Sequence, residues 1–160
     1  AESADWLHEF TADLFDGGLP WCDGARELLD ALAEGGVPMA LVTNTRRALT
    51  ERALNSIGRQ YFSASVCGDE VVRAKPAPDP YERAAALLGL DPGQCLAIED
   101  SVTGAAAAED AGCPVLVVPN DLAVPATARR HQVASLSGLD IPQLLEIYAD
   151  LQPGRGERSA

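Results

Sequence analysis

Short apolar stretches alternate with amphipathic segments along most of this 160-residue chain. Each apolar stretch is about five residues long and rich in Val, Leu, Ile and Ala, as is typical of a buried strand. When strands alternate with helices, the strands form a parallel sheet, because each connection has to cross back over the sheet. Buried parallel strands also require helices on both faces of the sheet.

We therefore expect an α/β fold with a Rossmann-like parallel sheet and helices on both faces. The expected strands cover residues 38–44, 63–68, 95–99, 114–118 and 132–135. The expected helices cover residues 1–16, 24–34, 46–57, 80–88, 102–111, 123–130 and 142–151.

The composition limits the classes of partner. With a net charge of −12, the chain is not expected to bind nucleic acid or an anionic membrane surface. An anionic small molecule could still bind through a local cation, a metal or backbone N–H groups. The four cysteines include no C-x-x-C pair, which favours reduced, buried thiols in a cytoplasmic protein over a disulfide or metal role.

Polar residues that can bind a phosphate group follow three consecutive strands. Thr43 and Asn44 follow the first strand, Lys75 follows the second, and Glu99 and Asp100 follow the third. Ligands of parallel α/β sheets bind at the carboxyl ends of the strands. There a hydroxyl and a Lys can contact phosphate oxygens, and two carboxylates can hold Mg²⁺.

Each of these features also has a structural explanation. Thr43 can cap the next helix, Lys75 can be a solvated side chain, and the Glu-Asp pair can combine a cap with a surface acid. We favour the functional reading because all of them occur together at strand ends. By contrast, Asp79 in "APDPYE" and Asp140 in "DIPQ" each lie one or two residues before a Pro and are expected to cap helices.

The segments "LVTNT", "AKPAPDPY" and "CLAIEDSVTGAAAAEDAGCPVLVV" resemble the second, third and fourth motifs of the haloacid dehalogenase superfamily. The pattern is most similar to its branch of phosphoglycolate phosphatases and β-phosphoglucomutases. The resemblance implies that Thr43 binds the transferring phosphoryl group with Asn44 beside it. It also implies that Lys75 bridges this group and a nucleophilic carboxylate, and that Glu99 and Asp100 hold or orient Mg²⁺.

One motif of the resembled family is absent, namely the D-x-D that carries its nucleophile and its general acid/base. No D-x-D occurs in the sequence, and Asp16 in "LFDGG" lacks the second acid. The resemblance covers Leu19 to Leu151. It implies that residues 1–18 are the last part of a mostly missing cap domain and that 19–152 form a core without its central first strand. Residues 153–160, "PGRGERSA", are expected to be a disordered tail. Such a gap leaves two strands without a partner.

From the resemblance we expect a Mg²⁺-dependent phosphatase that acts on a small phosphorylated metabolite through an aspartyl phosphate, whose Asp is not in this chain. The chain alone is expected to be inactive. The alternatives are a non-catalytic or regulatory module and a phosphotransferase, either a phosphomutase or kinase-like. A receiver domain is disfavoured, because its acidic cluster precedes its Thr and Lys, whereas here Thr43 and Lys75 precede Glu99 and Asp100.

Overall fold

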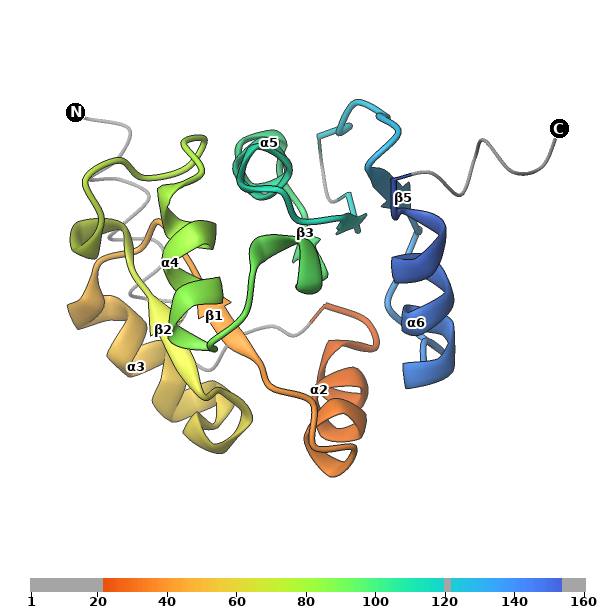
Figure 1. Cartoon of the computed structure of the whole chain (residues 1–160). Helices are drawn as coiled ribbons and strands as arrows, with labels where there is room; N and C mark the ends of the chain where they lie inside the picture. Colours follow the sequence, from red (N-terminus) through yellow and green to blue (C-terminus); the bar gives the residue numbers. More distant parts are fainter. Residues whose placement is uncertain (1–21, 120–121, 154–160) are drawn as a thin grey trace, which may run out of the picture.

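The computed structural model describes residues 22–119 and 122–153 (Figure 1). Its helices are α2 (Ala25–Glu34), α3 (Arg47–Ile57), α4 (Asp79–Leu87), α5 (Val102–Ala111) and α6 (Ile141–Asp150). Its strands are β1 (Ala40–Val42), β2 (Ala64–Val66), β3 (Ala97–Glu99), β4 (Val115–Val117) and β5 (Arg130–Gln132). Short 3₁₀ turns are η1 (Arg59–Tyr61), η2 (Gly68–Glu70) and η3 (Pro92–Gln94). The expected helix 1–16, the cap segment 1–18 and residues 154–160 of the expected tail lie outside the described residues.

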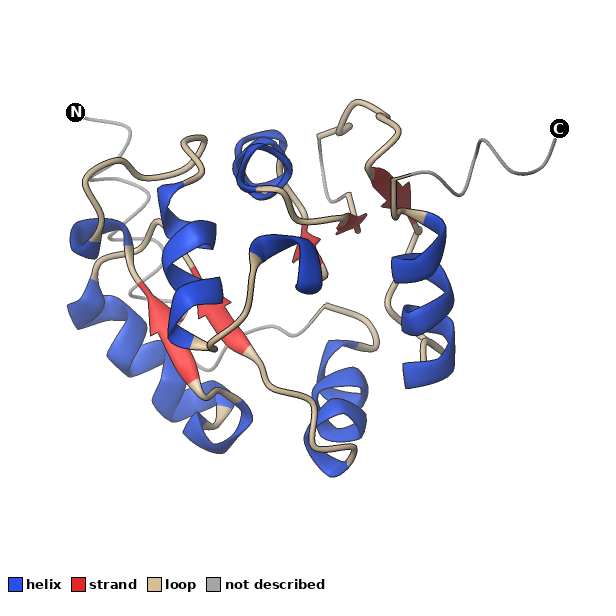
Figure 2. Cartoon of the chain, in the orientation of Figure 1, coloured by secondary structure: helices blue, strands red, loops and turns tan. Residues whose placement is uncertain are grey.

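All strand pairs in the described part of the chain are parallel, which confirms the α/β class expected from the alternation. The strands form two sheets, β1-β2 and β3-β4-β5, and Figure 2 shows the helices arranged around them. The observed strands β1 to β4 each lie within the expected range but are a few residues shorter, because the ladder bonds stop where the chain turns into the next helix or loop.

Strand β4 separates the two halves of the core. Val115 and Val117 pack on one side with the alanines of α5 and with Tyr81 of α4. Leu116 points to the other side, where it packs with leucines of α2 and α6. Alternate residues of a strand point to opposite faces, so the run of apolar residues in β4 serves two helical layers at once.

In the described part of the chain, the two sheets are separated between β1 and β3, and each of these strands pairs on one side only. Thr43 donates its N–H to β2 at 3.0 Å, so the backbone of the preceding Val42 faces away from β2. In the same way Ala97 donates to β4, and the backbone of Ile98 faces away from β4. Ile98 is 39% exposed, although its strand, β3, lies near the centre of the folded chain. Within residues 22–119 and 122–153, β1 and β3 therefore each have a neighbouring strand on one side only.

One expected helix is wrong. Residues 123–130 run without helical structure into β5, which begins at Arg130. Pro125 interrupts the apolar pattern, and a proline in a helix interior removes a hydrogen bond. Two side chains satisfy the extended backbone instead: Gln132 Nε2 donates to the Val124 carbonyl at 2.6 Å and Arg130 Nη1 to the Pro125 carbonyl at 2.9 Å. The expected strand at 132–135 accordingly ends three residues earlier, at Gln132.

The two expected helix caps have different outcomes. Asp140 caps α6 as expected: its carboxylate accepts the Gln143 N–H at 2.9 Å, and the Gln143 side-chain oxygen accepts the Asp140 N–H at 3.0 Å. Asp79 does not cap α4, because the helix begins one residue earlier than expected and Pro78 occupies the cap position. The Asp79 carboxylate instead accepts a 3.0 Å hydrogen bond from Arg73.

All four cysteines are free thiols. Cys67 and Cys113 are buried, as expected, whereas Cys22 is exposed and Cys95 is partly buried. Burial raises the pKa of the Cys113 thiol to about 12, which keeps it protonated and inert at neutral pH. Among the described helices, none combines the length and the apolar character needed to cross a membrane.

Candidate functional site

The carboxyl ends of β1, β2 and β3 bring the predicted lysine and glutamate together. The Lys75 ammonium donates to the Val42 carbonyl at 3.0 Å and to Glu99 Oε1 at 2.6 Å. Val42 is the last residue of β1 and Glu99 is the last residue of β3. Lys75 therefore spans the opening between the two sheets, at the edge where ligands of α/β folds bind.

The ion pair between Lys75 and Glu99 is buried, since the two side chains are only 10% and 7% exposed. A buried pair of this kind is stable only if further groups satisfy both charges. Tyr81 supplies one such group, because its hydroxyl donates to the same Glu99 oxygen. Its ring centroid also lies 5.2 Å from Lys75 Nζ, within the range of a cation–π contact. Burial and the Glu99 charge both raise the pKa of Tyr81, so its hydroxyl remains a donor.

Tyr81 is a site residue that the sequence analysis missed. It lies in the first turn of α4, where an aromatic residue at helical spacing indicates core packing, and its ring does belong to the core. Its hydroxyl contacts Glu99 only because α4 packs across the ends of the strands. The signal in the sequence that could have identified Tyr81 is its position. It follows Lys75 by six residues and lies in the helix that begins directly after the Lys75 loop.

Gly104 of α5 makes room for the Glu99 carboxylate. A Cβ atom at this position would collide with both carboxylate oxygens of Glu99. The glycine in "SVTG" therefore allows α5 to pack against the end of β3 while the carboxylate stays between helix and sheet. Any larger residue would push Glu99 away from Lys75.

Thr43 and Asn44 adopt different roles after β1. The Thr43 hydroxyl oxygen accepts the Thr45 N–H at 3.1 Å, and its own proton can still be donated to a ligand. Neither residue caps α3, whose cap position is occupied by Arg46 without a side-chain bond. The Asn44 side chain lies against the main chain of Lys75: it accepts the Lys75 N–H at 2.9 Å and donates to the Lys75 carbonyl at 3.2 Å. The Lys75–Pro76 peptide bond is cis.

Asp100 is the exposed carboxylate of the candidate site and directly follows β3. Its neighbour Ser101 caps α5 by accepting the Gly104 N–H at 3.0 Å, so capping accounts for this hydroxyl. Among residues 22–119 and 122–153, no three His, Cys, Asp or Glu side chains are grouped in a way that could hold a metal ion. An exposed carboxylate nevertheless fits Mg²⁺, which binds one or two carboxylates and keeps several waters.

The Glu99 carboxylate is already engaged by Lys75 and Tyr81. The motif allows Glu99 either to ligate the metal directly or to orient a neighbouring group. The bonds to Lys75 and Tyr81 favour the second role, the orientation of Lys75. Asp100, the other carboxylate of the predicted metal pair, is exposed to solvent, as a hydrated cation requires.

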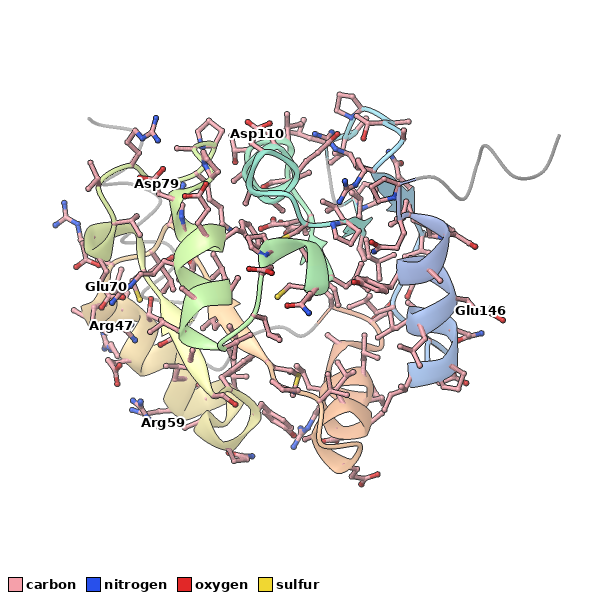
Figure 3. The ribbon with its side chains drawn as sticks, viewed as in Figure 1. Arg47, Arg59, Glu70, Asp79, Asp110 and Glu146 are labelled. Atoms are coloured by element: carbon pink, nitrogen blue, oxygen red, sulfur yellow. The ribbon has the colours of Figure 1, made fainter. Side chains whose placement is uncertain are left out.

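A clasp around Arg47 supports the loop that carries Thr43. Figure 3 shows Arg47 beside Glu70, and its guanidinium donates to both Glu70 oxygens, at 3.0 and 2.6 Å. The same group donates to the Ser65 hydroxyl at 2.7 Å and to Glu51 at 3.2 Å. The Glu70 carboxylate also accepts the Cys67 N–H. These bonds tie the start of α3 to the end of β2.

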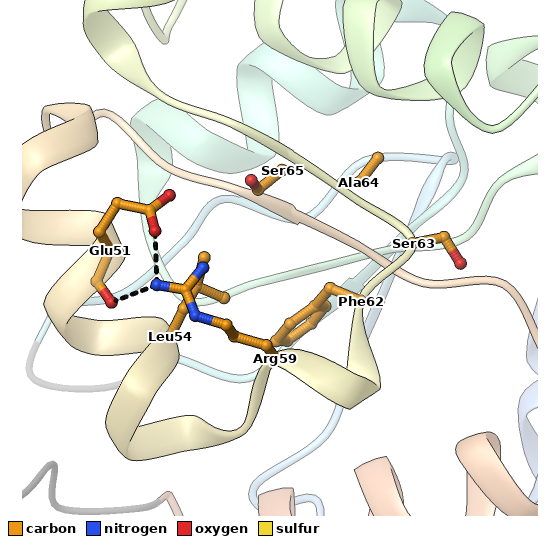
Figure 4. Close-up of a pocket in the computed structure, with 7 residues that line it drawn as sticks. All are labelled: Glu51, Leu54, Arg59, Phe62, Ser63, Ala64 and Ser65. Carbon is orange, nitrogen blue, oxygen red and sulfur yellow. Dashed lines mark hydrogen bonds and ion pairs between the residues drawn. The ribbon is translucent and has the colours of Figure 1, made fainter.

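A hollow of about 180 Å³ lies elsewhere on the molecule (Figure 4). None of the residues that line it is a predicted site residue, and within it Arg59 is paired with Glu51. We therefore place the candidate site at the strand ends and not in this hollow. Its lining residues are Glu51, Leu54, Arg59, Phe62, Ser63, Ala64 and Ser65.

Comparisons with known proteins show which proteins this chain is similar to. The chain is 34% identical over 147 residues to the β-phosphoglucomutase of Mycobacterium bovis, an alignment that covers 88% of the chain and 55% of the mutase. It is 38% identical over 98 residues to the phosphoglycolate phosphatase of Thiobacillus denitrificans, covering 61% and 43%. The chain thus spans about half the length of the curated relatives it matches.

The crystal structure of CbbY from Rhodobacter sphaeroides in complex with phosphate has the same fold, with a TM-score of 0.75 and 27% identity. The superposition covers 83% of this chain and 63% of CbbY. The profile of the haloacid dehalogenase-like hydrolases matches residues 2–112, including Thr43, Lys75 and the Glu99–Asp100 pair. Since this match covers more than half of the chain, the protein belongs to the haloacid dehalogenase-like hydrolases.

Proposed function

We propose that the protein is a Mg²⁺-dependent phosphatase that acts on a small phosphorylated metabolite. The observation that carries the proposal is the buried Lys75 ammonium, held at the ends of two strands by Glu99 and Val42. Two of its three N–H groups are used in these bonds, so one can contact a phosphoryl oxygen. Membership of a hydrolase family with phosphatase and phosphomutase relatives supports the same reaction class.

In this proposal each residue has a separate task. The Thr43 hydroxyl and the Lys75 ammonium donate to the transferring phosphoryl group, and Glu99 keeps Lys75 in place. Asp100 would hold Mg²⁺, which when bound neutralises charge on the phosphoryl oxygens. Phosphoryl transfer depends mainly on positioning and charge stabilisation, and these are the properties that the site residues supply.

The nucleophile in the proposal is an aspartate of a D-x-D motif outside these 160 residues. A strand that ends in this motif would fit between β1 and β3, because the backbone groups of Val42 and Ile98 face that side and not β2 or β4. Lys75, which contacts the ends of both strands, would then lie beside the nucleophile. The four free thiols support a cytoplasmic setting for such an enzyme.

Phosphomutase activity is the second candidate. Of the relatives compared above, the one whose alignment covers the largest share of this chain is named a β-phosphoglucomutase. A mutase would use the same residues but return the phosphoryl group to a sugar hydroxyl instead of water. Release of inorganic phosphate and formation of an isomeric sugar phosphate distinguish the two reactions.

The test is the rate of phosphate release from p-nitrophenyl phosphate and sugar phosphates by the native-length protein, with Mg²⁺ and with EDTA. We expect Mg²⁺-dependent turnover that falls about 100-fold or more in Asp100→Asn, with an unchanged unfolding midpoint. Asp110→Asn removes an exposed carboxylate from α5 and serves as the control with full activity. A native-length protein that lacks turnover, or that begins at Ala1, would instead be a regulatory module.

A further inference from the structure

We infer that Asn44 acts as a positioning residue that clamps the main chain of Lys75, and that its side chain is not a phosphate ligand. The inference rests on the proposed function, because it concerns how the lysine of that site is placed. Sequence comparison alone puts Asn44 beside the phosphoryl group. The structure assigns its side chain to a different partner.

The clamp is a reciprocal pair of hydrogen bonds between an amide side chain and a peptide unit. Asn44 Oδ1 accepts the Lys75 N–H at 2.9 Å, and Asn44 Nδ2 donates to the Lys75 carbonyl at 3.2 Å. An asparagine side chain has one carbonyl and one NH₂ group, and both are directed to the same residue here. Their common partner fixes the plane of the amide and occupies its carbonyl oxygen and one of its two N–H donors.

The main chain of Asn44 is itself held at the end of β1. Gly68 donates its N–H to the Thr45 carbonyl at 3.1 Å, and the Thr45 N–H is bonded to Thr43. A side chain at Gly68 would collide with the backbone of Asn44, so the end of β2 lies directly against this loop. Asn44 is therefore a rigid base for the clamp.

Lys75 is consequently anchored at both ends of its side chain. Asn44 holds its main chain, while Val42 and Glu99 hold its ammonium. A lysine loses rotamer entropy when its long side chain is fixed. A site that has fixed the lysine before the reaction avoids this cost in the transition state. The clamp should therefore contribute to kcat, whereas a phosphate ligand would contribute to KM as well.

The first test is amide hydrogen exchange of the native-length protein, because this readout does not depend on activity. In Asn44→Ala the Lys75 N–H loses its acceptor, and we expect its exchange to accelerate about fivefold or more. Asn44→Asp keeps an acceptor and should retain most of the protection. Asn55→Ala, which removes an exposed amide bonded to Arg59, is the matched control and should leave Lys75 unchanged. Unchanged exchange in Asn44→Ala would overturn the inference.

The second test is steady-state kinetics of the same variants with Mg²⁺ and a phosphorylated substrate. The inference predicts that Asn44→Ala lowers kcat about tenfold or more and changes KM less than about twofold. An increased KM with unchanged kcat would show that Asn44 contacts the substrate and would overturn the positioning role. A wild-type protein without turnover would overturn the proposed function, and the exchange experiment would still decide whether Asn44 clamps Lys75.

Discussion

Tyr81 is the residue whose contribution can be measured most directly. Its hydroxyl donates to the charged Glu99 carboxylate, and its ring packs in the core. Tyr81→Phe removes the hydroxyl and keeps the ring. Because hydrogen bonds to charged groups are worth about 1.5–3 kcal/mol, we expect the free energy of unfolding to fall by that amount. Urea denaturation of the native-length protein measures it.

Tyr148→Phe is the control for this substitution. The Tyr148 hydroxyl donates to the neutral Gly93 carbonyl at 2.8 Å, and neither residue belongs to the candidate site. Loss of this hydrogen bond should cost about 0.5–1.5 kcal/mol. In an active protein Tyr148→Phe should leave kcat unchanged, whereas Tyr81→Phe should lower it by loosening Glu99 and Lys75. If Tyr148→Phe lowered the stability and kcat as much as Tyr81→Phe does, this would contradict the role of the Tyr81 hydroxyl.

Most of the candidate site was predictable at the level of residue position. Thr43, Lys75 and Asp100 each follow a strand, and parallel strands bring their carboxyl ends to one edge of a sheet. The partners of the side chains were not predictable in this way. The use of Asn44 as a clamp and of Tyr81 as a donor depends on how a loop and α4 pack against the strands, which local spacing does not encode.

At the scale of elements, agreement between sequence and structure depends on local signals. Helix α5 was predicted with its observed bounds, because Ser101 supplies a cap and Gly112 ends the helix in a left-handed conformation. The expected helix at 123–130 failed because Pro125 interrupts it and because the side chains of Arg130 and Gln132, at the end of the same segment, bond to its extended backbone. Apolar spacing alone could not exclude a helix there.

The link between α3 and β2 should depend on pH. Arg47 donates two hydrogen bonds to Glu70 and holds the pKa of that carboxyl at about 2. Since the folded-state pKa is lower than the ordinary value, the pair stabilises the fold above about pH 4.5. This contribution is lost as the pH falls toward 2. Because Glu70 is partly exposed, we expect it to be about 1 kcal/mol or less.

Glu70→Gln tests this dependence. The variant should be less stable than the wild type at pH 7, and the difference should shrink progressively between pH 4.5 and pH 2. Glu82→Gln, at an exposed glutamate of α4, controls for the change in net charge. Thermal unfolding across the pH range measures both. A stability difference between Glu70→Gln and wild type that stays constant down to pH 2 would exclude the clasp as its source.

At the scale of the whole molecule, the separated sheets are the feature that most needs explanation. Edge strands with unpaired N–H and C=O groups favour pairing with another strand, and here β1 and β3 both have such an edge. The Val42 carbonyl on the β1 edge is bonded to Lys75 rather than to a strand. The exposed Ile98 side chain on β3 is also unusual for a strand between helical layers. An additional parallel strand would satisfy both edges.

This arrangement makes a prediction about single amides. In the 160-residue chain the N–H groups of Val42 and Ile98 should exchange rapidly, whereas those of Thr43 and Ala97, which bond to β2 and β4, should be protected. In a longer polypeptide that carries a D-x-D strand, Val42 and Ile98 should gain protection of about tenfold or more, because each would lie inside a sheet. Thr43 and Ala97 should change less. Exchange at Val42 and Ile98 that is equally fast in both proteins would mean that no strand occupies the opening, and the nucleophile would then have to reach Lys75 from a loop.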